Sequence, residues 1–423
     1  MSAAESTTLP IADPASFKRQ ALRWASRFPF CIAFDSNGRT DDLSAIDWML
    51  GVDVGDRLVH DADGGLDVLD DFLARTDGYR MGWLGYGLAR DTERLNSRHA
   101  DDLDWPVIHM VRPRYTLRLT GSRLTIDRNT PEALAILDAI DREDAGPGTI
   151  DLPALTPTVD EAWHRERVEA IRAAIARGDV YEVNLCLPWE ATAHLHDPAS
   201  TFLALNERAR APFSAFIHDG ARSVFCLSPE RFLARRNGRL ISQPIKGTAR
   251  RDADPHTDHR LAEDLAASAK ERAENLMIAD LVRNDLARCS VPGSVEVTEL
   301  CAVHSFPTVH QMISTIRSRA LPHASVGDIL RATFPMGSMT GAPKHAAIQT
   351  IDRLEATGRG LYAGSIGYVG PDGDMDWNVV IRTLLRDGDR LRLHTGGAIT
   401  YDSIARDEWA ECRLKTAVMR PGQ

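Results

Sequence analysis

The sequence predicts an α+β fold, in which strands are joined as hairpins and the helices lie in separate stretches of the chain. Three dipeptides support this prediction: Asn237-Gly238, Asp372-Gly373 and Asp387-Gly388 each separate two strand-like runs, as tight turns do. Strands that follow one another through such turns pair antiparallel. A doubly wound parallel sheet would instead need a helix between successive strands, and that alternation is not found.

The N-terminal part of the chain contains short apolar segments that predict strands. PFCIAF (29–34) reads as one strand, and YTLRLTGSRLTI (115–126) reads as two strands with a turn between them. Glycine, proline and threonine then gather at 144–158 and the periodicity stops, which predicts a linker. We therefore expect an N-terminal region at 1–143, this linker, and a C-terminal region at 159–423 that carries the chemistry.

The C-terminal region contains both helical and strand patterns. Residues 160–177 read as a helix, and 258–288 read as one longer helix with polar and apolar faces. Between them, two alternating runs meet at Asn237-Gly238 and predict a hairpin. We expect an antiparallel meander and a final helix at the end of the chain, with strands at 362–369, 376–386 and 390–395 and the helix at 405–419.

Composition and charge exclude several classes of protein. Apolar residues make up 43% of the chain and charged residues 26%, as in globular proteins, and no apolar run reaches the roughly 18 residues of a membrane span. The net charge of −10, without a block of Lys or Arg, argues against nucleic acid or an anionic membrane as the main partner. The N-terminus lacks the features of a signal peptide, so we expect a cytoplasmic protein.

The six cysteines are scattered along the chain and form no CxxC pair. This spacing predicts neither a disulfide framework nor a zinc site. We expect buried free thiols in a reducing compartment.

Two predicted helices each carry a pair of glutamates three residues apart. The pairs are Glu271 with Glu274 and Glu408 with Glu411, and Lys415 follows Glu411 at i+4. This spacing places both carboxylates of a pair on one face of a helix. One such pair alone is usually a solvated face. Two pairs facing one another across a cleft could hold Mg²⁺, which takes one or two carboxylates and keeps several waters.

A lysine and a glutamate near the predicted hairpin are candidates for catalysis. Lys246 stands between Ile245 and Gly247, and partial desolvation there would lower its pKa and free the amine as a nucleophile. Glu230 lies on the strand that the hairpin folds back beside Lys246, so both groups could reach one cleft. An ordinary lysine at a strand end, or a structural salt bridge, would produce the same pattern.

Two further segments suit the lining of a site better than packing. FPMGSMTGAPK (334–344) combines glycine and proline with small hydroxyl residues. HTGGAIT (394–400) contains Gly396 and Gly397, where backbone N–H groups can approach an anion closely. A phosphate loop is a poor alternative, because neither GxxxxGK[ST] nor GxGxxG occurs.

Taken together, and in this order, these stretches resemble the chorismate-utilising enzymes, a family that includes anthranilate synthase component I, aminodeoxychorismate synthase component I, isochorismate synthase and salicylate synthase. The resemblance covers about Val159 to the C-terminus. It is carried by GDVYEVNL, SPERF, PIKGT, KERAENLMIADLVRND, FPMGSMTGAPK, IGY with VVIRT, GGAIT and EWAEC. FPFCIAFDSNG and GWLGYGLAR resemble the family's N-terminal domain. The implied fold is a sandwich of two mainly antiparallel sheets flanked by helices, with the site in the cleft between the sheets.

The resemblance also implies roles for single residues. Glu274 and Glu411 would bind Mg²⁺ directly, and Glu271 and Glu408 would reach it through waters. The metal would hold the ring carboxylate of chorismate. The resemblance adds that Lys415 and the backbone at Gly396 and Gly397 would share that carboxylate.

The remaining implied roles concern the other end of the substrate and the acid. Arg382 and Tyr362 would bind the enolpyruvyl carboxylate. Glu230 would protonate the departing C4 hydroxyl, because hydroxide is a poor leaving group. Other residues implied to line the site are Gly247, Thr248, His310 and Ser338.

Position 246 separates the members of the family. Anthranilate synthases typically read PIAGT where this chain reads PIKGT, so Lys246 resembles the aminodeoxychorismate synthases. There the lysine attacks C2, the C4 hydroxyl leaves, and ammonia adds at C4 and expels the lysine. The isomerising and hydrolysing relatives use a lysine to activate water at a position that is Glu182 here. The glutamate leaves that role without its usual group, which argues against the isochorismate interpretation. Met336, in place of a glycine, and Gln311-Met312 are mild departures that affect pocket shape.

The resemblance therefore implies amination of chorismate in para-aminobenzoate and folate biosynthesis. Anthranilate synthase is the nearest alternative, and isochorismate or salicylate synthase a further one. A non-catalytic partner of a glutamine amidotransferase would leave Glu230, Lys246 and the glutamate pairs without a reason to coexist. No Gly-x-Cys-x-Gly motif is present, so we expect ammonia to come from a separate glutaminase subunit.

Overall fold

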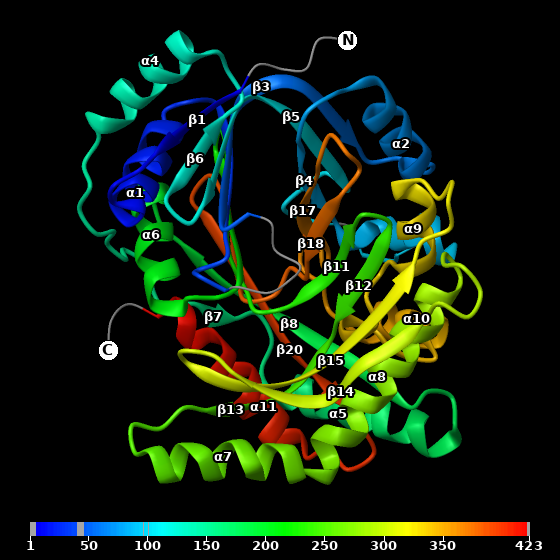
Figure 1. The fold of residues 1–423 in the computed structure, drawn as a ribbon. Helices are drawn as coiled ribbons and strands as arrows, with labels where there is room; N and C mark the ends of the chain where they lie inside the picture. Colours follow the sequence, from blue (N-terminus) through cyan, green and yellow to red (C-terminus); the bar gives the residue numbers. More distant parts are fainter. Residues whose placement is uncertain (1–5, 40–45, 96, 100, 421–423) are drawn as a thin grey trace.

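The strands form two hydrogen-bonded sheets that share one long strand, and helices cover their outer faces (Figure 1). The computed structural model describes residues 6–39, 46–95, 97–99 and 101–420. The strand pairings found within these residues are all antiparallel. The predicted α+β class is confirmed.

The first sheet holds most of the N-terminal strands and the strands on either side of the last turn. Its hydrogen-bonded order is β7 (Thr156–Pro157), β8 (Glu182–Thr192), β20 (Arg390–Ile399), β19 (Thr383–Asp387), β10 (Arg222–Ser228), β9 (Phe213–Asp219), β2 (Phe30–Asp35), β3 (Trp48–His60), β5 (Ile108–Thr120), β6 (Arg123–Ile126) and β1 (Thr7–Pro10).

The second sheet begins at Ile108 to Val111 of β5, the half of this strand that does not pair with β6. It continues through β4 (Arg80–Leu84), β17 (Ser365–Val369), β18 (Met375–Asn378), β11 (Arg231–Arg236), β12 (Arg239–Gln243) and β15 (Val309–Arg319). Two more strands, β13 (Ile245–Arg250) and β14 (Glu296–Ser305), also pair with β15. The short β16 (Gly341–Ala342) pairs with the start of β8.

An apolar core fills the space between the two sheets. Ile32 of β2 and Val224 of β10 come from the first sheet, whereas Trp83 of β4 and Ile366 of β17 come from the second. All four are at most 1% exposed and belong to one cluster. The sandwich implied by the resemblance is confirmed.

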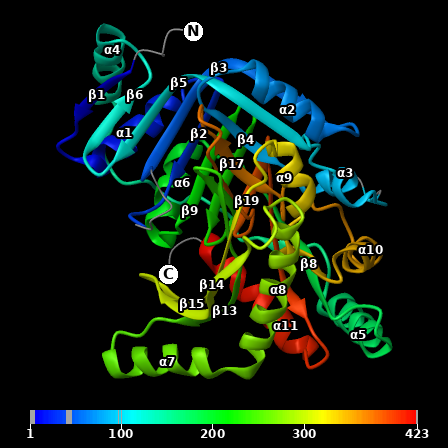
Figure 2. The same ribbon diagram turned by 45° about the vertical axis from the view of Figure 1, so that its right-hand side comes forward.

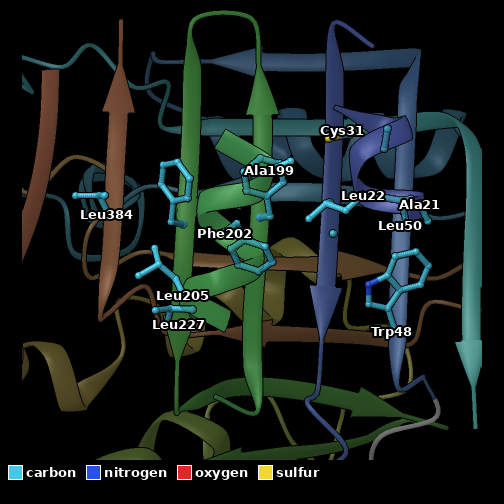
Figure 3. Packing of buried hydrophobic residues seen from close by; sticks show 14 of the residues in the cluster. Ala21, Leu22, Cys31, Trp48, Leu50, Ala199, Phe202, Leu205, Leu227 and Leu384 are labelled. Atoms are coloured by element: carbon cyan, nitrogen blue, oxygen red, sulfur yellow. The ribbon is translucent and has the colours of Figure 1, made fainter. Parts of the chain in front are cut away.

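Helices cover the outside of the sandwich (Figure 2). Figure 3 shows Phe202 and Leu205 of one such helix beside the strand that carries Leu227, which is next to the strand that carries Leu384. The helices over the first sheet are α1 (Pro14–Ala25), α4 (Thr130–Asp141), α6 (Pro198–Ala209) and α11 (Ala405–Lys415). Those over the second are α2 (Gly65–Arg75), α3 (Ala89–Glu93), α8 (Ala269–Ala287) and α9 (Val326–Thr333), while α5 (Glu161–Arg177) packs with α10 (Lys344–Leu354) against the start of β8.

The predicted helix at 258–288 is wrong as a single element. It is divided into α7 (Pro255–Ala267) and α8 at Ser268, which is extended and accepts a hydrogen bond from the Glu271 backbone N–H at 3.3 Å. A serine three residues before a glutamate is a helix-start signal, so the sequence did carry the sign of this break. The new start places Glu271 in the first turn of α8.

The predicted meander is correct at its two ends and wrong in the middle. β17 pairs with β18, and β19 pairs with β20. However, the run 376–386 is two strands, since β18 pairs with β11 in the second sheet and β19 with β10 in the first. The chain crosses between the sheets at 379–382, where Arg382 has a φ of 50°.

The 144–158 segment contains no helix, and its one strand is the two-residue β7. Strands on either side of it pair with each other, as β2 with β9 and β4 with β17. The regions before and after this segment therefore contribute to the same sheets.

Two general expectations can be compared with the structure. The six cysteines, all within the described residues, are free and buried, as predicted. Among the described helices, none is long and apolar enough to cross a membrane.

Candidate active site

Lys246 lies in a bulge of the second sheet. Along β13, Ile245 pairs with Ile313 and Thr248 with Gln311, so Lys246 and Gly247 together oppose one residue of β15. Such bulges change the direction in which a side chain points. Gly247 has a φ of 87°, and a Cβ there would lie 2.9 Å from Oε2 of Glu271. The bulge thus brings Lys246 and the first turn of α8 together.

The ammonium of Lys246 meets a carboxylate from the first sheet. Its Nζ lies 2.8 Å from Oε1 of Glu182, the first residue of β8, whose side chain is 1% exposed. The other oxygen of Glu182, Oε2, is buried and has no hydrogen-bond partner in the described part of the chain. The site therefore contains a buried ion pair with one carboxylate oxygen still free to accept.

The pKa of Lys246 differs from the expectation. Burial alone would lower this pKa, as predicted, but the carboxylates of Glu182, Glu274 and Glu230 outweigh burial and raise it above the usual value. The prediction of a lowered pKa is therefore wrong, because it considered the neighbours of Lys246 in the chain and not the acids brought in by other elements. A nucleophilic Lys246 must transfer a proton before it attacks.

Glu230 has the surroundings of a general acid. It lies between β10 and β11, is 5% exposed, and accepts a hydrogen bond from Oγ of Ser338 at 2.7 Å. Burial raises the pKa of Glu230 to about 7, although the Ser338 hydroxyl and Lys246 pull it down. The carboxyl group can therefore be protonated near neutral pH, which protonation of a leaving hydroxyl requires. Ser338, from the 3₁₀-helix η2 (Gly337–Met339), is thus part of this site.

The two glutamate pairs lie on separate helices, Glu271 and Glu274 on α8 and Glu408 and Glu411 on α11. A Cβ at Gly397 of β20 would lie 3.1 Å from Oε2 of Glu408 and 3.7 Å from Oε1 of Glu411, both of which are on α11. The absence of a side chain at Gly397 therefore leaves space beside both carboxylates. Across from them, α8 presents Glu271 and Glu274.

The pKa of Lys270 responds to the glutamates of both pairs. Burial would lower the pKa of Lys270, but Glu274, Glu408, Glu271 and Glu411 together outweigh burial and raise it. One ammonium is thus influenced by all four carboxylates. The sequence analysis did not single out Lys270, although its position four residues before Glu274 is an ion-pair spacing that could have been noticed.

The buried carboxylate of Glu274 has few hydrogen bonds or cations to stabilise its charge. It is 8% exposed, its Oε1 accepts no hydrogen bond from the described residues, and Lys270 is 3.9 Å away. Burial raises the pKa of Glu274 to about 7, and the nearby Glu182 and Glu271 add to the increase. Four acids around one partly exposed lysine are an environment that a hard cation would stabilise.

These residues suit Mg²⁺ better than a metal that needs a closed ligand set. Within the described residues, no three His, Cys, Asp or Glu side chains converge as a metal-binding group. Mg²⁺ binds through one or two carboxylates and retains waters, so it does not require such a group. One oxygen of Glu408 is already engaged by the protein, because Oε1 accepts a hydrogen bond from Oγ of Ser403 at 2.8 Å.

Lys415, Gly396 and Gly397 have different surroundings in the site. Nζ of Lys415 lies 2.7 Å from Oε1 of Glu411 and donates to the Gly396 carbonyl oxygen at 2.6 Å. A Cβ at Gly396 would lie 2.4 Å from the Leu185 carbonyl oxygen, so glycine there permits close packing against β8. Gly397 is the glycine that faces the carboxylates.

Arg382 is a half-buried cation that no acid among the described residues pairs with. Burial lowers the pKa of Arg382, and no carboxylate counteracts this effect. Among the residues described, none forms an ion pair or hydrogen bond with its guanidinium, so the group is available to an anion. Tyr362 is 4% exposed, stacks on His394 with ring centroids 4.9 Å apart, and accepts a hydrogen bond from Cys186 Sγ at 3.5 Å.

Within the described part of the chain, no hydrogen bond or ion pair joins His310 or Thr248 to this group. Nδ1 of His310 lies 2.8 Å from Oγ of Ser305, and its Nε2 lies 3.0 Å from Oδ1 of Asp258 on α7. Both ring nitrogens are therefore engaged by the protein. Thr248 is exposed on β13.

Lys344, the last residue of the FPMGSMTGAPK segment, has a structural environment. Its Nζ lies 2.6 Å from Oδ2 of Asp285, and both side chains are buried. This segment was predicted to line the site, and Ser338 does contact Glu230. Its C-terminal end instead fixes α10 to α8.

Comparison with known proteins gives a consistent result. The profile of the chorismate binding enzyme family matches residues 52–421. The chain is 40% identical over 338 residues to aminodeoxychorismate synthase component 1 of Klebsiella aerogenes, covering 79% of this chain and 74% of the relative. It is 36% identical over 358 residues to an anthranilate synthase component 1 of Haloarcula marismortui, covering 78% and 73%.

Solved structures agree in fold. Anthranilate synthase component I from Streptococcus pneumoniae superposes with a TM-score of 0.76 at 25% identity, covering 99% of this chain and 93% of that one. MenF, the menaquinone-specific isochorismate synthase of Escherichia coli, has a TM-score of 0.76 at 20% identity and covers 99% and 94%. The extent of the family match and the identity to these relatives show that the chain belongs to the chorismate binding enzyme family.

Proposed function

We propose that the chain is the synthase component of an aminodeoxychorismate synthase, which converts chorismate and ammonia to 4-amino-4-deoxychorismate for para-aminobenzoate and folate biosynthesis. The observation that carries the proposal is Lys246, held in the site by Glu182 at 2.8 Å and close enough to Glu230 for each to influence the pKa of the other. Relatives named aminodeoxychorismate synthase component 1 match this chain over about four fifths of its length.

The proposed reaction assigns one task to each of three residues. Lys246 transfers a proton to Glu182 and attacks C2 of the ring through its free amine. The C4–O bond breaks, and protonated Glu230 supplies the proton with which the hydroxyl leaves as water. Ammonia then adds at C4 with its lone pair, the ring double bonds shift back, and the bond between C2 and Lys246 breaks with its electron pair returning to the lysine nitrogen.

The two substrate carboxylates would be bound at opposite sides of the site. Arg382, a half-buried arginine that pairs with no acid among the described residues, and Tyr362 are proposed to bind the enolpyruvyl carboxylate. Glu274 and Glu411 would hold Mg²⁺, with Glu271 and Glu408 acting through waters. When bound, the ion would supply positive charge for the ring carboxylate, beside Lys415 and Gly397.

Anthranilate synthase is the second candidate, because relatives of that name also match. It leaves the environment of Lys246 unexplained, since attack of ammonia at C2 needs no lysine nucleophile there. Isochorismate synthase is supported by likeness in fold alone. Its water-activating lysine would coincide with Glu182, which here is paired with Lys246.

Ammonia is proposed to come from a separate glutaminase subunit, and "component 1" in the names of relatives supports a second component. A cytoplasmic location is proposed on the basis of six free cysteines, which suit a reducing compartment.

Product analysis tests the proposal directly. The purified chain is incubated with chorismate, Mg²⁺ and ammonium, and the product is identified by chromatography and mass spectrometry. We expect 4-amino-4-deoxychorismate, a covalent adduct on Lys246 when ammonia is omitted, and loss of both in Lys246→Ala. Lys18→Ala, a change on the distant helix α1, is the control. Formation of anthranilate, or an undiminished rate in Lys246→Ala, would show the proposal to be wrong.

A further inference from the structure

A cavity of about 540 Å³ lies on the outer side of α11, away from the glutamates. One wall is formed by the linker residues Pro153 to Pro157, and another by Trp189 of β8 and Trp409 of α11. Arg413, Thr416, Met419 and Arg420 complete its lining. We call it the α11 cavity. Its volume is in the range of pockets that hold small organic ligands.

One face of α11 borders the catalytic cleft, and another borders the α11 cavity. Glu408, Glu411 and Lys415 follow at spacings of three and four residues and share one face of the helix. Trp409 and Arg413 are four residues apart and lie on another face, which lines the α11 cavity. The cavity is therefore distinct from the catalytic cleft, although one helix borders both.

Two indole rings give the cavity a flat apolar wall. Trp189 and Trp409 are stacked, with centroids 6.1 Å apart and an angle of 27° between their planes. They are 5% and 7% exposed, so what remains accessible of each is a small area of ring. Nε1 of Trp189 already donates to Oγ1 of Thr395 at 2.7 Å, so its one hydrogen-bond donor is satisfied within the protein. Such a wall favours a planar aromatic ligand.

No acidic group among the described residues pairs with the two arginines beside the indoles. The side chain of Arg413 forms no hydrogen bond or ion pair with the described residues. Arg420 donates only long hydrogen bonds, to the Arg413 carbonyl oxygen at 3.4 Å and to Thr416 Oγ1 at 3.5 Å. Guanidinium groups bind carboxylates through paired hydrogen bonds. The free charges therefore favour an anion, and most readily a carboxylate.

We propose that the α11 cavity binds a small planar aromatic carboxylate, whose ring packs against Trp189 and Trp409 and whose carboxylate is bound by Arg413 and Arg420. We further infer that this site is coupled to the catalytic cleft. The proposal does not depend on which reaction the cleft performs.

The coupling follows from the elements that the cavity wall is made of. Trp189 belongs to β8, which begins with Glu182, and its partner Thr395 immediately precedes Gly396. Trp409 stands between Glu408 and Glu411 on α11. A ligand that orders these indoles also restricts β8, β20 and α11, and thereby changes the free energy of binding in the cleft.

Calorimetric titration of the full chain tests the binding site. Indole-3-acetate is the probe, and indole-3-acetamide is its uncharged control of nearly the same shape. We expect the acetate to bind on the order of tenfold more tightly, because a charge-assisted hydrogen bond is stronger than a neutral one. In the double variant Arg413→Gln/Arg420→Gln, the acetate should bind only as well as the amide, and binding of the amide should be unchanged.

Arg406→Gln is the matched control, since Arg406 is on the same helix, its side chain is 84% exposed, and it does not line the cavity. Equal affinities for acetate and amide in the unmodified chain would overturn the proposal. So would an equal loss of acetate binding in Arg406→Gln and in the double variant.

Chorismate binding tests the coupling. The dissociation constant of chorismate is measured with and without saturating indole-3-acetate, and we expect a change of about fivefold or more that is absent in the double variant. The same factor should appear in the affinity for the acetate when chorismate is saturating. An unchanged constant, or a change that persists in the double variant because the acetate competes in the cleft, would overturn the coupling.

Discussion

Nζ of Lys246 lies 2.8 Å from Oε1 of Glu182, and this ion pair joins the second sheet, which carries β13, to the first, which carries β8. Neither residue can be removed alone without leaving the other charge buried, at an expense of about 3–5 kcal/mol in stability. Glu182 has a second oxygen without a partner among the described residues, so it can accept a proton without giving up a hydrogen bond. The pair therefore both fixes the lysine and offers a route for its proton.

The first prediction concerns Glu182→Gln, which keeps the shape of the side chain and removes its charge. Glu182 is one of the carboxylates that raise the pKa of Lys246, so this pKa should fall in the variant. The pH dependence of trace acetylation by acetic anhydride, followed at Lys246 by mass spectrometry, measures the change. Because the free amine is the reactive form, the midpoint should move to lower pH.

Lys18, read in the same digests, serves as an internal control, and its midpoint should not move. A midpoint at Lys246 that is equal in the two proteins would contradict the assigned role of Glu182. The variant should also be more stable than Lys246→Ala, because burying an uncharged amide beside a lysine that can lose its proton is less unfavourable than leaving a carboxylate unpaired.

The second prediction concerns Glu230 and Ser338. Glu230→Gln should lower kcat by about 10²- to 10⁴-fold, because the amide cannot protonate the departing hydroxyl. Ser338→Ala removes a hydrogen bond that stabilises the carboxylate, so the pKa of Glu230, now about 7, should rise by about one unit.

Infrared difference spectra of a pH titration measure this change. The carbonyl band of the protonated acid should disappear around pH 7 in the unmodified chain, and at higher pH in Ser338→Ala. Part of the signal belongs to Glu274, so the Glu230 component is the part that is absent from Glu230→Gln. A band that titrates at lower pH in Ser338→Ala would show that the serine does not stabilise the carboxylate.

Much of the site could be predicted from the sequence because its residues lie in short motifs whose local geometry is simple. The i+3 spacing of Glu271 and Glu274 determines that they share a face of a helix. The dipeptide Asn237-Gly238 does form the hairpin turn, with positive φ at both residues. In such cases the neighbours in the chain are also the neighbours in space.

Properties that depend on other elements could not be predicted in this way. The pKa of Lys246 is set by Glu182 and Glu274, which are far from it in the chain, and its direction was therefore mistaken. The crossover at 379–382 was missed because each half of the run 376–386 satisfies the strand pattern, and only pairing with β11 or β10 shows which sheet each half joins. Distant partners decided both outcomes.

The third prediction concerns Mg²⁺. Glu274→Gln and Glu411→Gln should each abolish turnover, because loss of one ligand also displaces the substrate carboxylate. Binding can be measured without turnover, since a ligand that binds only the folded state raises the melting temperature. Mg²⁺ should raise the melting temperature of the unmodified chain and have little effect on either variant.

Glu263→Gln on α7 is the control, because its side chain is 66% exposed and pairs with only His259 among the described residues. It should respond to Mg²⁺ as the unmodified chain does. Without the metal, Glu274→Gln should be at least as stable as the unmodified chain, because it removes one of four crowded carboxylates. Full activity in EDTA would refute the assignment of the metal site.

The last prediction concerns the source of ammonia. A glutaminase of the expected kind needs a reactive thiolate, but the six cysteines are buried, and burial raises the pKa of most of their thiols: Cys31, Cys186, Cys226, Cys289 and Cys412. The chain alone should therefore be inactive with glutamine.

With ammonium, the chain alone should be active, and more so at raised pH because NH₃ is the nucleophile. Addition of a glutaminase subunit should restore the use of glutamine at neutral pH, since direct delivery raises the effective concentration of ammonia near C4. The assay compares glutamine with ammonium on the purified chain, with and without that subunit. Sustained amination from glutamine by the chain alone would refute a separate source. In that event, alkylation of the cysteines should be tested next, because it would have to abolish glutamine use and spare ammonium use.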